Sequence, residues 1–583
     1  MTEYSLFLDN TGENIRENIM GNIENKKEVN SLYLFNLYYY YYNRGYSNLI
    51  ITEITNLLVL VFMVFFMIFL VQCVDFKELI GYNTNENISL SHFINMSNFW
   101  DLKHNVFIII SLIVFLGYVI IQLISIYASS KKFWKIRKIY KEDLEITTED
   151  LDNLTWNDVS NKIIKYYCEP NLNSYTLALK IMAKENLMIS VYDELDKNSL
   201  KFNKYPLTKL LEWNFIFCFI NPLINSNREI NSNVKIEKKK YYEKVQSNIN
   251  RIFVLNLLFM PFLLIFMVLY LILQYGEQFY NNPNLIVNRQ WSIKSFWKLR
   301  YYNELPHSYN SRLDKSGLIL KEYGKQFPSR LTETISRFIM FILGSFFLIL
   351  LLLTFLNENL LINLNITNDK PILWYMGILG GILTIIKSLI YKNVLYSPEK
   401  IMKKLSENID LKEEWVNDCR NKKIKNKIMK LFPLRAVLLL QECYYLVLTP
   451  YILWFILKKE ANIICVYLIN LLTTHHSING FINKNSLFIN YNQIKENHKT
   501  EKSFDNFQKN YPEWNMSSFL YTQESIYPNN NININNNNNI NINMQNNNIE
   551  HNNISNSSNN FNSNLNSIIN DTQQTNDIFL NTF

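Results

Sequence analysis

Cysteine and glycine are scarce in this chain of 583 residues, which contains six cysteines and 13 glycines. The cysteines lack both the CxxC spacing of zinc or redox sites and the density of a disulfide framework. The glycines form no GxGxxG, no GxxxxGK[ST] and no nucleophile elbow, which argues against a nucleotide-driven pump or a hydrolase. We therefore expect no metal, no cofactor and no covalent catalysis.

Net charge is also low, at +8 from 58 basic and 50 acidic residues. The basic residues gather beside apolar blocks, a pattern that favours a membrane surface over nucleic acid as the partner. Mean hydropathy is −0.08, because long apolar stretches are averaged with an asparagine-rich C-terminal part. These blocks predict an all-α integral membrane protein.

Two apolar runs near the N-terminus, 49–74 and 106–127, are each long enough to cross a hydrocarbon core, which takes roughly 20 residues. The basic stretch 131–141 (KKFWKIRKIYK) follows the second run. The positive-inside rule places this stretch in the cytosol, and with it the N-terminal segment 1–48. The region 49–130 is therefore predicted to be a transmembrane hairpin.

The loop of this hairpin contains two sequons, at Asn87 and Asn95, and is predicted to be lumenal. Both asparagines are candidate glycosylation sites. A second hairpin is predicted over 337–391, because apolar runs at 338–356 and 374–390 are joined by a short linker.

Residues 131–250 are predicted to form a cytosolic helical region. Within it, 207–224 is too short and too polar at its start for a span, and is predicted to be an interfacial helix. The apolar run 252–273 meets the length criterion, yet a single crossing there would place the second hairpin on the wrong side. We predict instead that it is re-entrant and bent at Pro261, within a region 251–336 that is otherwise cytosolic.

Residues 392–522 are predicted to be cytosolic helices with a second re-entrant segment at 446–457, which is half a span long and is broken by Pro450. The tail 523–583 is dominated by asparagine and is predicted to be disordered. The expected total is four transmembrane helices and two re-entrant segments.

Several sequence words occur in a specific order. Glu212-Trp213-Asn214 follows Leu211, Trp291 lies in RQWS, Asn303-Glu304-Leu305-Pro306-His307 comes next, and RAVLLLQECYYLVLTPYILW begins at Arg435. Together with Tyr41–Tyr46 and the late FQKNYPEW, these words resemble the autophagy-related protein 9 family over residues 41 to 522. The asparagine-rich tail resembles nothing in that family.

The resemblance implies a homotrimer with swapped helices and cytosolic N- and C-termini. It also implies ATP-independent phospholipid scrambling at the growing autophagosome, with lipids delivered by a bridge-like lipid-transfer protein and with other autophagy factors as partners. The implied locations are the preautophagosomal structure or phagophore membrane and Golgi- or endosome-derived cytoplasmic vesicles.

A scramblase needs a wet polar track, because dragging a headgroup through hydrocarbon is costly. The candidates are polar residues in or beside membrane segments: Glu53, Asn56, Asn256, Arg337, Thr384 and Lys387. Lys387 could line a cavity or snorkel to the cytosolic interface, and Glu53 could be an interfacial carboxylate. We expect Glu212 with Trp213, and Glu304 with His307, to be structural and not catalytic.

Two other functions stay open. A membrane scaffold would recruit autophagy factors through its cytosolic surfaces, with scrambling incidental. An ion channel or secondary transporter would be expected to have internal repeats or charge pairs at mid-membrane, and neither is visible in the sequence.

Overall fold

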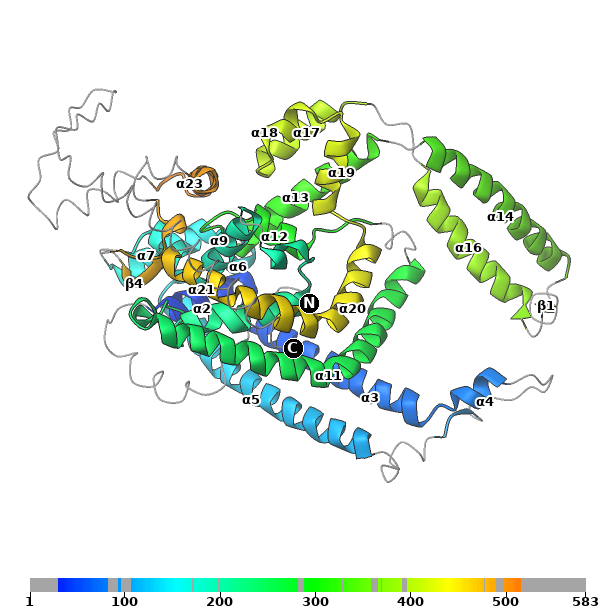
Figure 1. Cartoon of the computed structure of the whole chain (residues 1–583), viewed down its shortest axis with the longest axis horizontal. Coiled ribbons are helices and arrows are strands. Elements are labelled where there is room, and N and C mark those ends of the chain that lie inside the picture. Colours follow the sequence, from blue (N-terminus) through cyan, green and yellow to red (C-terminus); the bar gives the residue numbers. More distant parts are fainter. Residues whose placement is uncertain are drawn as a thin grey trace, which may run out of the picture. The chain divides into compact units, whose positions relative to one another are not determined.

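The computed structural model describes twelve stretches of the chain: residues 30–81, 93–95, 106–169, 172–197, 200–281, 288–327, 330–357, 365–367, 370–390, 396–475, 478–488 and 497–514. They belong to one compact unit that extends to Met516. The predicted tail 523–583 and the sequon residue Asn87 lie outside these stretches. Helices make up most of the described structure (Figure 1).

The N-terminal hairpin consists of α3 (Tyr46–Gln72) and α5 (Val106–Glu142), which pack against each other. The short α4 (Phe76–Gly81) follows α3. Helix α2 (Ser31–Tyr42, SLYLFNLYYYYY) precedes the hairpin, and nine of its twelve residues are buried, mostly leucine and tyrosine. Tyr40 packs its ring 4.6 Å from that of Tyr140 on α5, so α2 anchors the basic end of the hairpin.

The region after α5 folds into short capped helices. They are α6 (Asp150–Asn153), α7 (Trp156–Tyr167), α8 (Ser174–Ile181), α9 (Ala183–Lys197) and α10 (Lys209–Phe215), with 3-10 turns at Lys201–Lys204, Asn221–Leu223 and Ser232–Lys235. Thr155 and Asn173 each cap a helix through a capping box, which satisfies the free backbone N–H groups at the start of α7 and α8.

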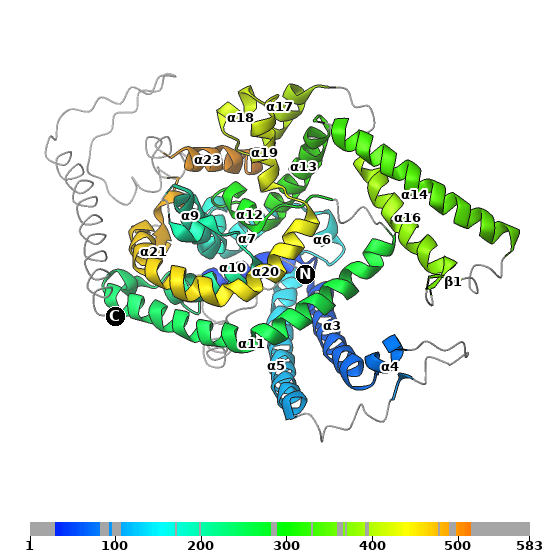
Figure 2. The same cartoon turned by 45° about the vertical axis from the view of Figure 1, so that its right-hand side comes forward.

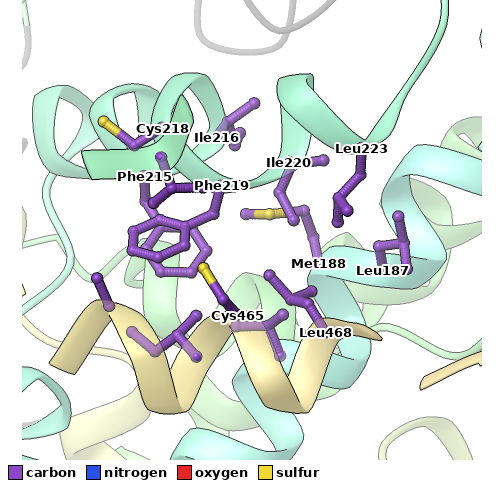
Figure 3. Close-up of a cluster of buried hydrophobic side chains, with 14 of the residues drawn as sticks. Leu187, Met188, Phe215, Ile216, Cys218, Phe219, Ile220, Leu223, Cys465 and Leu468 are labelled. Carbon is purple, nitrogen blue, oxygen red and sulfur yellow. The ribbon is translucent and has the colours of Figure 1, made fainter. Parts of the chain in front are cut away.

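The segment 207–224 is not arranged as an interfacial helix, which would expose its apolar side chains. After α10 it continues as the π-helix Ile216–Ile220, and Phe215, Phe219 and Leu223 are fully buried. Figure 3 shows these side chains pointing toward α21 (Lys458–Leu471) together with Met188 of α9. The prediction was wrong because the apolar surface of this segment has a protein partner, which local hydropathy does not reveal.

Helix α11 runs without interruption from Lys238 to Asn281 and contains Pro261. It bends along its length (Figures 1 and 2) but does not break. A proline removes one backbone hydrogen bond, and the helix can continue through it with a bend. By length and composition, its stretch Lys238–Leu273 is long enough to span a membrane, so the re-entrant course of this segment remains a prediction.

The second hairpin consists of α14 (Arg330–Leu356) and α16 (Ile372–Leu389), which lie side by side in both views (Figures 1 and 2). Its tip contains strands β1 (Asn365–Thr367) and β2 (Lys370–Pro371), paired antiparallel with Asn365 opposite Pro371. The apolar window of α14 has no buried side chain, and Phe341 and Phe355 are 74% and 86% exposed. Within the described residues, α14 packs extensively against α16 alone.

Before this hairpin lie α12 (Ile293–Leu299) and α13 (Pro306–Lys325), and after it α17 (Pro398–Asn408), α18 (Glu413–Asn417) and α19 (Lys422–Leu431). Leu313, Leu320 and Tyr323 of α13 form one hydrophobic cluster with α17 and α19.

The remaining helices are α20 (Arg435–Tyr451), the π-helix Ile452–Leu457, α21 and α23 (His498–Asn510). The antiparallel pair β3 (Leu472–His475) and β4 (Ile478–Asn483) follows α21, with Leu472 opposite Asn483, and a 3-10 turn covers Lys484–Ser486.

Three helices in the described residues are long and apolar enough to cross a membrane: Tyr46–Gln72, Lys238–Leu273 and Arg330–Leu356. Ile372–Lys387 is a shorter apolar helix. The chain is thus a mostly helical membrane protein, and the number of crossings stays a prediction.

Candidate functional site

Among the six predicted track residues, within the described part of the chain, Glu53 is the one with a buried side-chain oxygen that has no hydrogen-bond partner. It lies on α3, and its Oε1 is buried without a hydrogen-bond partner in the described structure. Lys132, on the neighbouring α5, acts on it electrostatically. Asn56, one turn further along α3, is partly exposed. The unbonded carboxylate oxygen of Glu53 is therefore a buried polar atom on a mostly apolar helix.

Asn256 lies on α11, which also contacts α3. Its side chain is 7% exposed, and Nδ2 donates a 2.9 Å hydrogen bond to the carbonyl of Ile252 in the preceding turn. Its amide is therefore partly satisfied within its own helix.

The other three track residues belong to the α14–α16 hairpin. Arg337 is exposed and pairs with Glu333 one turn away at 2.7 Å. The hydroxyl of Thr384 donates to the carbonyl of Gly380 at 2.8 Å. Lys387 is exposed in the last turn of α16, near the end of the hairpin that also holds Arg337. This position suits a lysine that extends to the interface.

The described structure therefore groups the six predicted track residues in two places and does not join them into one path. One group lies on α3 and α11 (Glu53, Asn56, Asn256) and the other on α14 and α16 (Arg337, Thr384, Lys387). Each group places polar side chains on helices whose apolar faces are exposed.

Glu212 lies inside the protein. The indole Nε1 of Trp297 donates a hydrogen bond to its Oε1, and the Trp297 ring stacks on Tyr192. Burial raises the pKa of Glu212 to about 7, with Glu442 adding to the rise and the Trp297 hydrogen bond opposing it. Trp213 is partly exposed and stacks on Phe217.

Asn214 is fully buried, and neither its Oδ1 nor its Nδ2 has a hydrogen-bond partner within the described residues. It follows Glu212 by two positions in α10. The sequence word that contains both residues thus belongs to the core.

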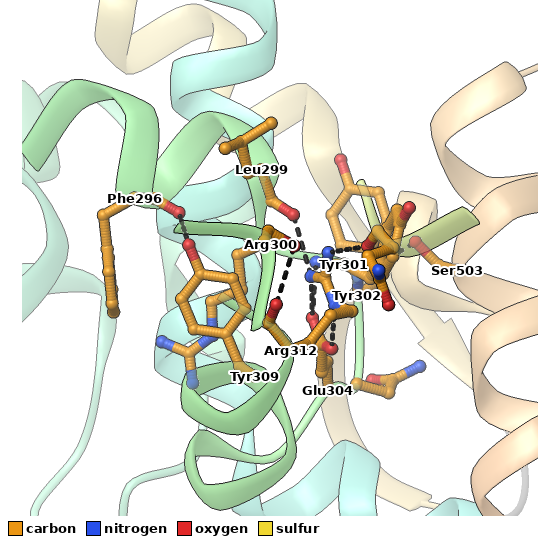
Figure 4. A network of polar contacts seen from close by, with 12 residues as sticks. Phe296, Leu299, Arg300, Tyr301, Tyr302, Glu304, Tyr309, Arg312 and Ser503 are labelled. Atoms are coloured by element: carbon orange, nitrogen blue, oxygen red, sulfur yellow. Dashed lines mark hydrogen bonds and ion pairs between the residues drawn. The ribbon is translucent and has the colours of Figure 1, made fainter. Parts of the chain in front are cut away.

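Glu304 belongs to a network of polar contacts between α12 and α13 (Figure 4), and the neighbouring Asn303 makes hydrogen bonds of its own. Asn303 has a left-handed backbone, at φ 58°, which asparagine tolerates better than most residues. Its Nδ2 donates to the carbonyl of Ser486, and its Oδ1 accepts from Asn186, both at 2.8 Å. The side chain thereby joins three segments that are far apart in sequence.

Glu304 accepts two hydrogen bonds from Arg312, at 2.7 and 2.6 Å, and a third from the backbone N–H of Tyr301. The side chains of Glu304 and Arg312 are 0% and 10% exposed. A buried carboxylate requires such a bidentate partner to offset its desolvation. Glu304 is therefore occupied by structural contacts.

Pro306 begins α13, where its missing N–H costs nothing. His307 follows, and its Nδ1 lies 3.0 Å from the hydroxyl of Tyr38 on α2. Burial, reinforced by the nearby charge of Arg44, lowers the pKa of His307 to about 4. The imidazole is consequently neutral at physiological pH and holds α13 against α2.

Trp291 donates its Nε1–H to the carbonyl of Leu313 at 3.2 Å and packs on Phe432. A side chain at Gly317 would begin 3.3 Å from that Nε1, so glycine permits this close contact. Pro450 is buried inside α20. Asn95 is exposed beside the short bridge between Val74 and Ile94, a position accessible to modification.

Sequence reasoning missed the partners of these residues. The partners lie between 8 and 183 positions away in the sequence; they are Trp297, Arg312, Asn186 and Ser486. No pattern of residue spacing predicts a contact between residues that far apart. The burial of Arg300 was not predicted either. This residue is 4% exposed, and its guanidinium carbon lies 5.4 to 5.8 Å from the ring centres of Phe296, Trp297 and Tyr309.

Long helices with exposed apolar faces, joined to a buried and hydrogen-bonded helical core, define an integral membrane protein. The family model described as autophagy protein ATG9 matches residues 22–488, and the chain belongs to this family.

The chain is similar to autophagy-related protein 9 of Dictyostelium discoideum, with 29% identity over 515 residues that cover 83% of this chain and 73% of that protein. The protein of the same name in Saccharomyces cerevisiae is 28% identical over 462 residues. That match covers 76% of this chain but 45% of the yeast protein, so this chain spans less than half the length of that relative.

A cryo-EM structure of Schizosaccharomyces pombe Atg9 has a similar fold, with a TM-score of 0.59 at 22% identity. The match covers 79% of this chain and 98% of that one. Together these similarities establish a membrane protein of the autophagy machinery.

Proposed function

We propose that this chain is an ATP-independent phospholipid scramblase that equilibrates lipids between the two leaflets as the autophagosome membrane expands. Membership of the ATG9 family supports the setting. The observation that carries the activity is the unbonded, buried Oε1 of Glu53 on the apolar helix α3, since a buried polar atom in a membrane segment would lower the barrier for a headgroup. Lowering it by roughly 7 kcal/mol would accelerate flipping about 10⁵-fold.

The α14–α16 hairpin supports a homotrimer with swapped helices. In the described structure its apolar side chains lie open, with Phe341 74% exposed, and α14 packs extensively against α16 alone. A neighbouring copy would cover part of this surface and would bring Arg337, Thr384 and Lys387 toward the polar group on α3 and α11.

In the cell, the proposed scramblase works with a bridge-like lipid-transfer protein and other autophagy factors. We place it at the preautophagosomal structure or phagophore and in Golgi- or endosome-derived vesicles, with both termini in the cytosol.

The test is a dithionite assay on liposomes that hold fluorescent lipid in both leaflets. The wild type is compared with a Thr384→Leu/Lys387→Leu variant and with Glu53→Gln. Ser345→Leu is the matched control, because its hydroxyl also bonds its own helix, at the carbonyl of Phe341. We expect the wild type and the control to expose the inner-leaflet dye without ATP, and both track variants to be slower.

If well-reconstituted wild type leaves the inner dye protected, scrambling is wrong for this chain. The alternative is then a membrane scaffold that recruits autophagy factors. The observation that favours this second function is the extent of the core outside the apolar helices, from α7 to α10 and from α17 to α23, which exceeds what a lipid track needs.

A further inference from the structure

Helix α19 (KKIKNKIMKL) has one apolar face and one lysine face. Ile424, Ile428 and Met429 are buried against the cluster that includes α13. The opposite side carries four exposed lysines, at positions 422, 423, 427 and 430, and the helix contains no acidic residue. In the described structure none of these four ammonium groups has an ion-pair partner, whereas Arg420 just before the helix pairs with Glu399.

The fifth lysine of α19 is surrounded by more positive charge. Lys425 is partly buried, with its Nζ 5.6 Å from the ring centre of Phe327. Burial lowers its pKa, and the charges of Arg289 and Lys422 lower it further. Arg289 is held beside the end of α19 because its Nη1 donates to the carbonyl of Phe432 at 3.0 Å. Basic side chains therefore gather on and beside α19, which itself contains no acidic residue.

The helix that carries the lysine face also directly precedes a helix with an exposed apolar surface. Three residues separate the end of α19 from the start of α20. Figures 1 and 2 show the chain passing directly from one helix to the other. Leu440 and Tyr444 of α20 are 70% and 61% exposed, and this apolar face continues to Phe455. At its far end Lys458 places its Nζ 3.5 Å from the ring centre of Trp454. Basic residues therefore flank the exposed apolar stretch at both ends.

We propose that the lysine face of α19 binds anionic phospholipid headgroups in the cytosolic leaflet next to α20. The proposal rests on the membrane orientation of the proposed function. Exposed apolar side chains of α20 would contact lipid tails, so the adjacent lysines come to headgroup level, where anionic lipids concentrate. Each lysine held there strengthens such association roughly fivefold at low salt.

The lysine face of α19 would give the protein a preference for anionic lipids. The predicted track residues do not by themselves indicate a preference for any lipid class. Anionic lipids would be enriched beside α20 on the cytosolic side, and zwitterionic lipids would not. The attraction would weaken as salt rises, because the exposed lysines are screened over about 10 Å at 0.1 M ionic strength.

The experiment uses the full-length chain reconstituted in phosphatidylcholine with a small amount of spin-labelled phosphatidylserine or spin-labelled phosphatidylcholine. Electron paramagnetic resonance separates protein-restricted lipid from bulk lipid and yields the relative association constant of the two labelled lipids. The test variant carries Lys422→Gln, Lys423→Gln, Lys427→Gln and Lys430→Gln. The matched control carries Lys400→Gln, Lys403→Gln, Lys404→Gln and Lys412→Gln, which removes the same charge from exposed positions on and just after α17.

We expect the wild type and the α17 control to prefer phosphatidylserine, with a preference that falls as salt is added. The α19 variant should lose at least about fivefold of this preference, which is the effect of a single lysine at the membrane surface. Equal losses in both variants would show a net-charge effect and overturn the assignment to α19. Full preference in the α19 variant would overturn it as well.

A wild type without any preference contradicts lipid binding and leaves an acidic protein segment as the partner of this face. Size-exclusion profiles and thermal unfolding of each variant identify any loss of folding. Dye scrambling on the same proteoliposomes is a separate readout, so absent scrambling with a retained lipid preference contradicts the proposed function alone.

Discussion

Glu212 and His307 are buried ionisable groups whose pKa values are displaced in ways that affect stability in opposite directions. Glu212 has a pKa of about 7, against 4.5 for an ordinary glutamate. Between these pH values the unfolded chain has released a proton that the folded chain keeps, so this group makes stability fall as pH rises. His307 has a pKa of about 4, against 6.5 normally. Between those values the unfolded chain binds the extra proton, so stability rises with pH.

We expect Glu212→Gln to remove the fall of stability with pH that Glu212 causes, and His307→Asn to remove the rise that His307 causes. Each group changes the free energy of unfolding by about 3 kcal/mol between its unfolded and folded pKa values, which differ by about 2.5 pH units. Relative to wild type, the Gln variant should gain stability from pH 5 to pH 7, and the Asn variant should lose it. Chemical unfolding in detergent at several pH values measures both, and parallel wild-type and variant profiles would contradict the two pKa displacements.

Pro261, at the scale of one element, was predicted to bend the segment that contains it, and the segment is a bent but continuous helix. The ring removes the N–H that would bond the carbonyl of Leu257, yet α11 continues on both sides for a total of 44 residues. Its packing against α20, α21 and the π-helix at Ile216–Ile220 holds the helix together through this defect.

Pro261→Ala should therefore raise the stability of the protein by about 1 to 3 kcal/mol, because it restores a helical hydrogen bond without loss of packing at an exposed position. Thermal unfolding in detergent is the measurement. Leu258→Ala is the control, since Leu258 is 63% exposed and its backbone hydrogen bonds would be unchanged. A lower midpoint for Pro261→Ala would mean that its bend is required by the neighbouring helices.

For the whole molecule, the decisive feature is the open surface of the α14–α16 hairpin. A Cβ atom added to Gly380 of α16 would be in ordinary van der Waals contact with Phe347 of α14. A Cβ atom added to Gly377 or Gly381 would have no neighbour within 4 Å. Those two glycines lie one turn apart on α16. In the proposed trimer this narrow face would allow a helix of a neighbouring copy to approach closely.

Gly377→Leu combined with Gly381→Leu should convert trimers to smaller species, since the added side chains would hold the neighbouring helix away. Mass photometry in detergent is the measurement. Gly117→Leu on α5 is the control for added bulk, because nothing lies within 4 Å of its would-be Cβ either. Trimers that tolerate both leucines would place the interface elsewhere on the hairpin.

The sequence by itself determined the features that depend on composition within a short window. The long apolar runs form the helices α3 and α14, as predicted. A helix satisfies its own backbone hydrogen bonds, so an apolar run can form one without a partner elsewhere in the chain. The ordered sequence words likewise indicated the ATG9 family, which the family model confirms.

Tertiary structure decided everything that depends on a partner distant in sequence. Glu212 meets Trp297 85 positions away, and Asn303 meets Ser486 183 positions away. The segment 207–224 became core for the same reason, since its burial depends on α9 and α21. Hydropathy and spacing are local properties, whereas hydrogen-bond partners and burial are set by which surfaces pack together when the chain folds.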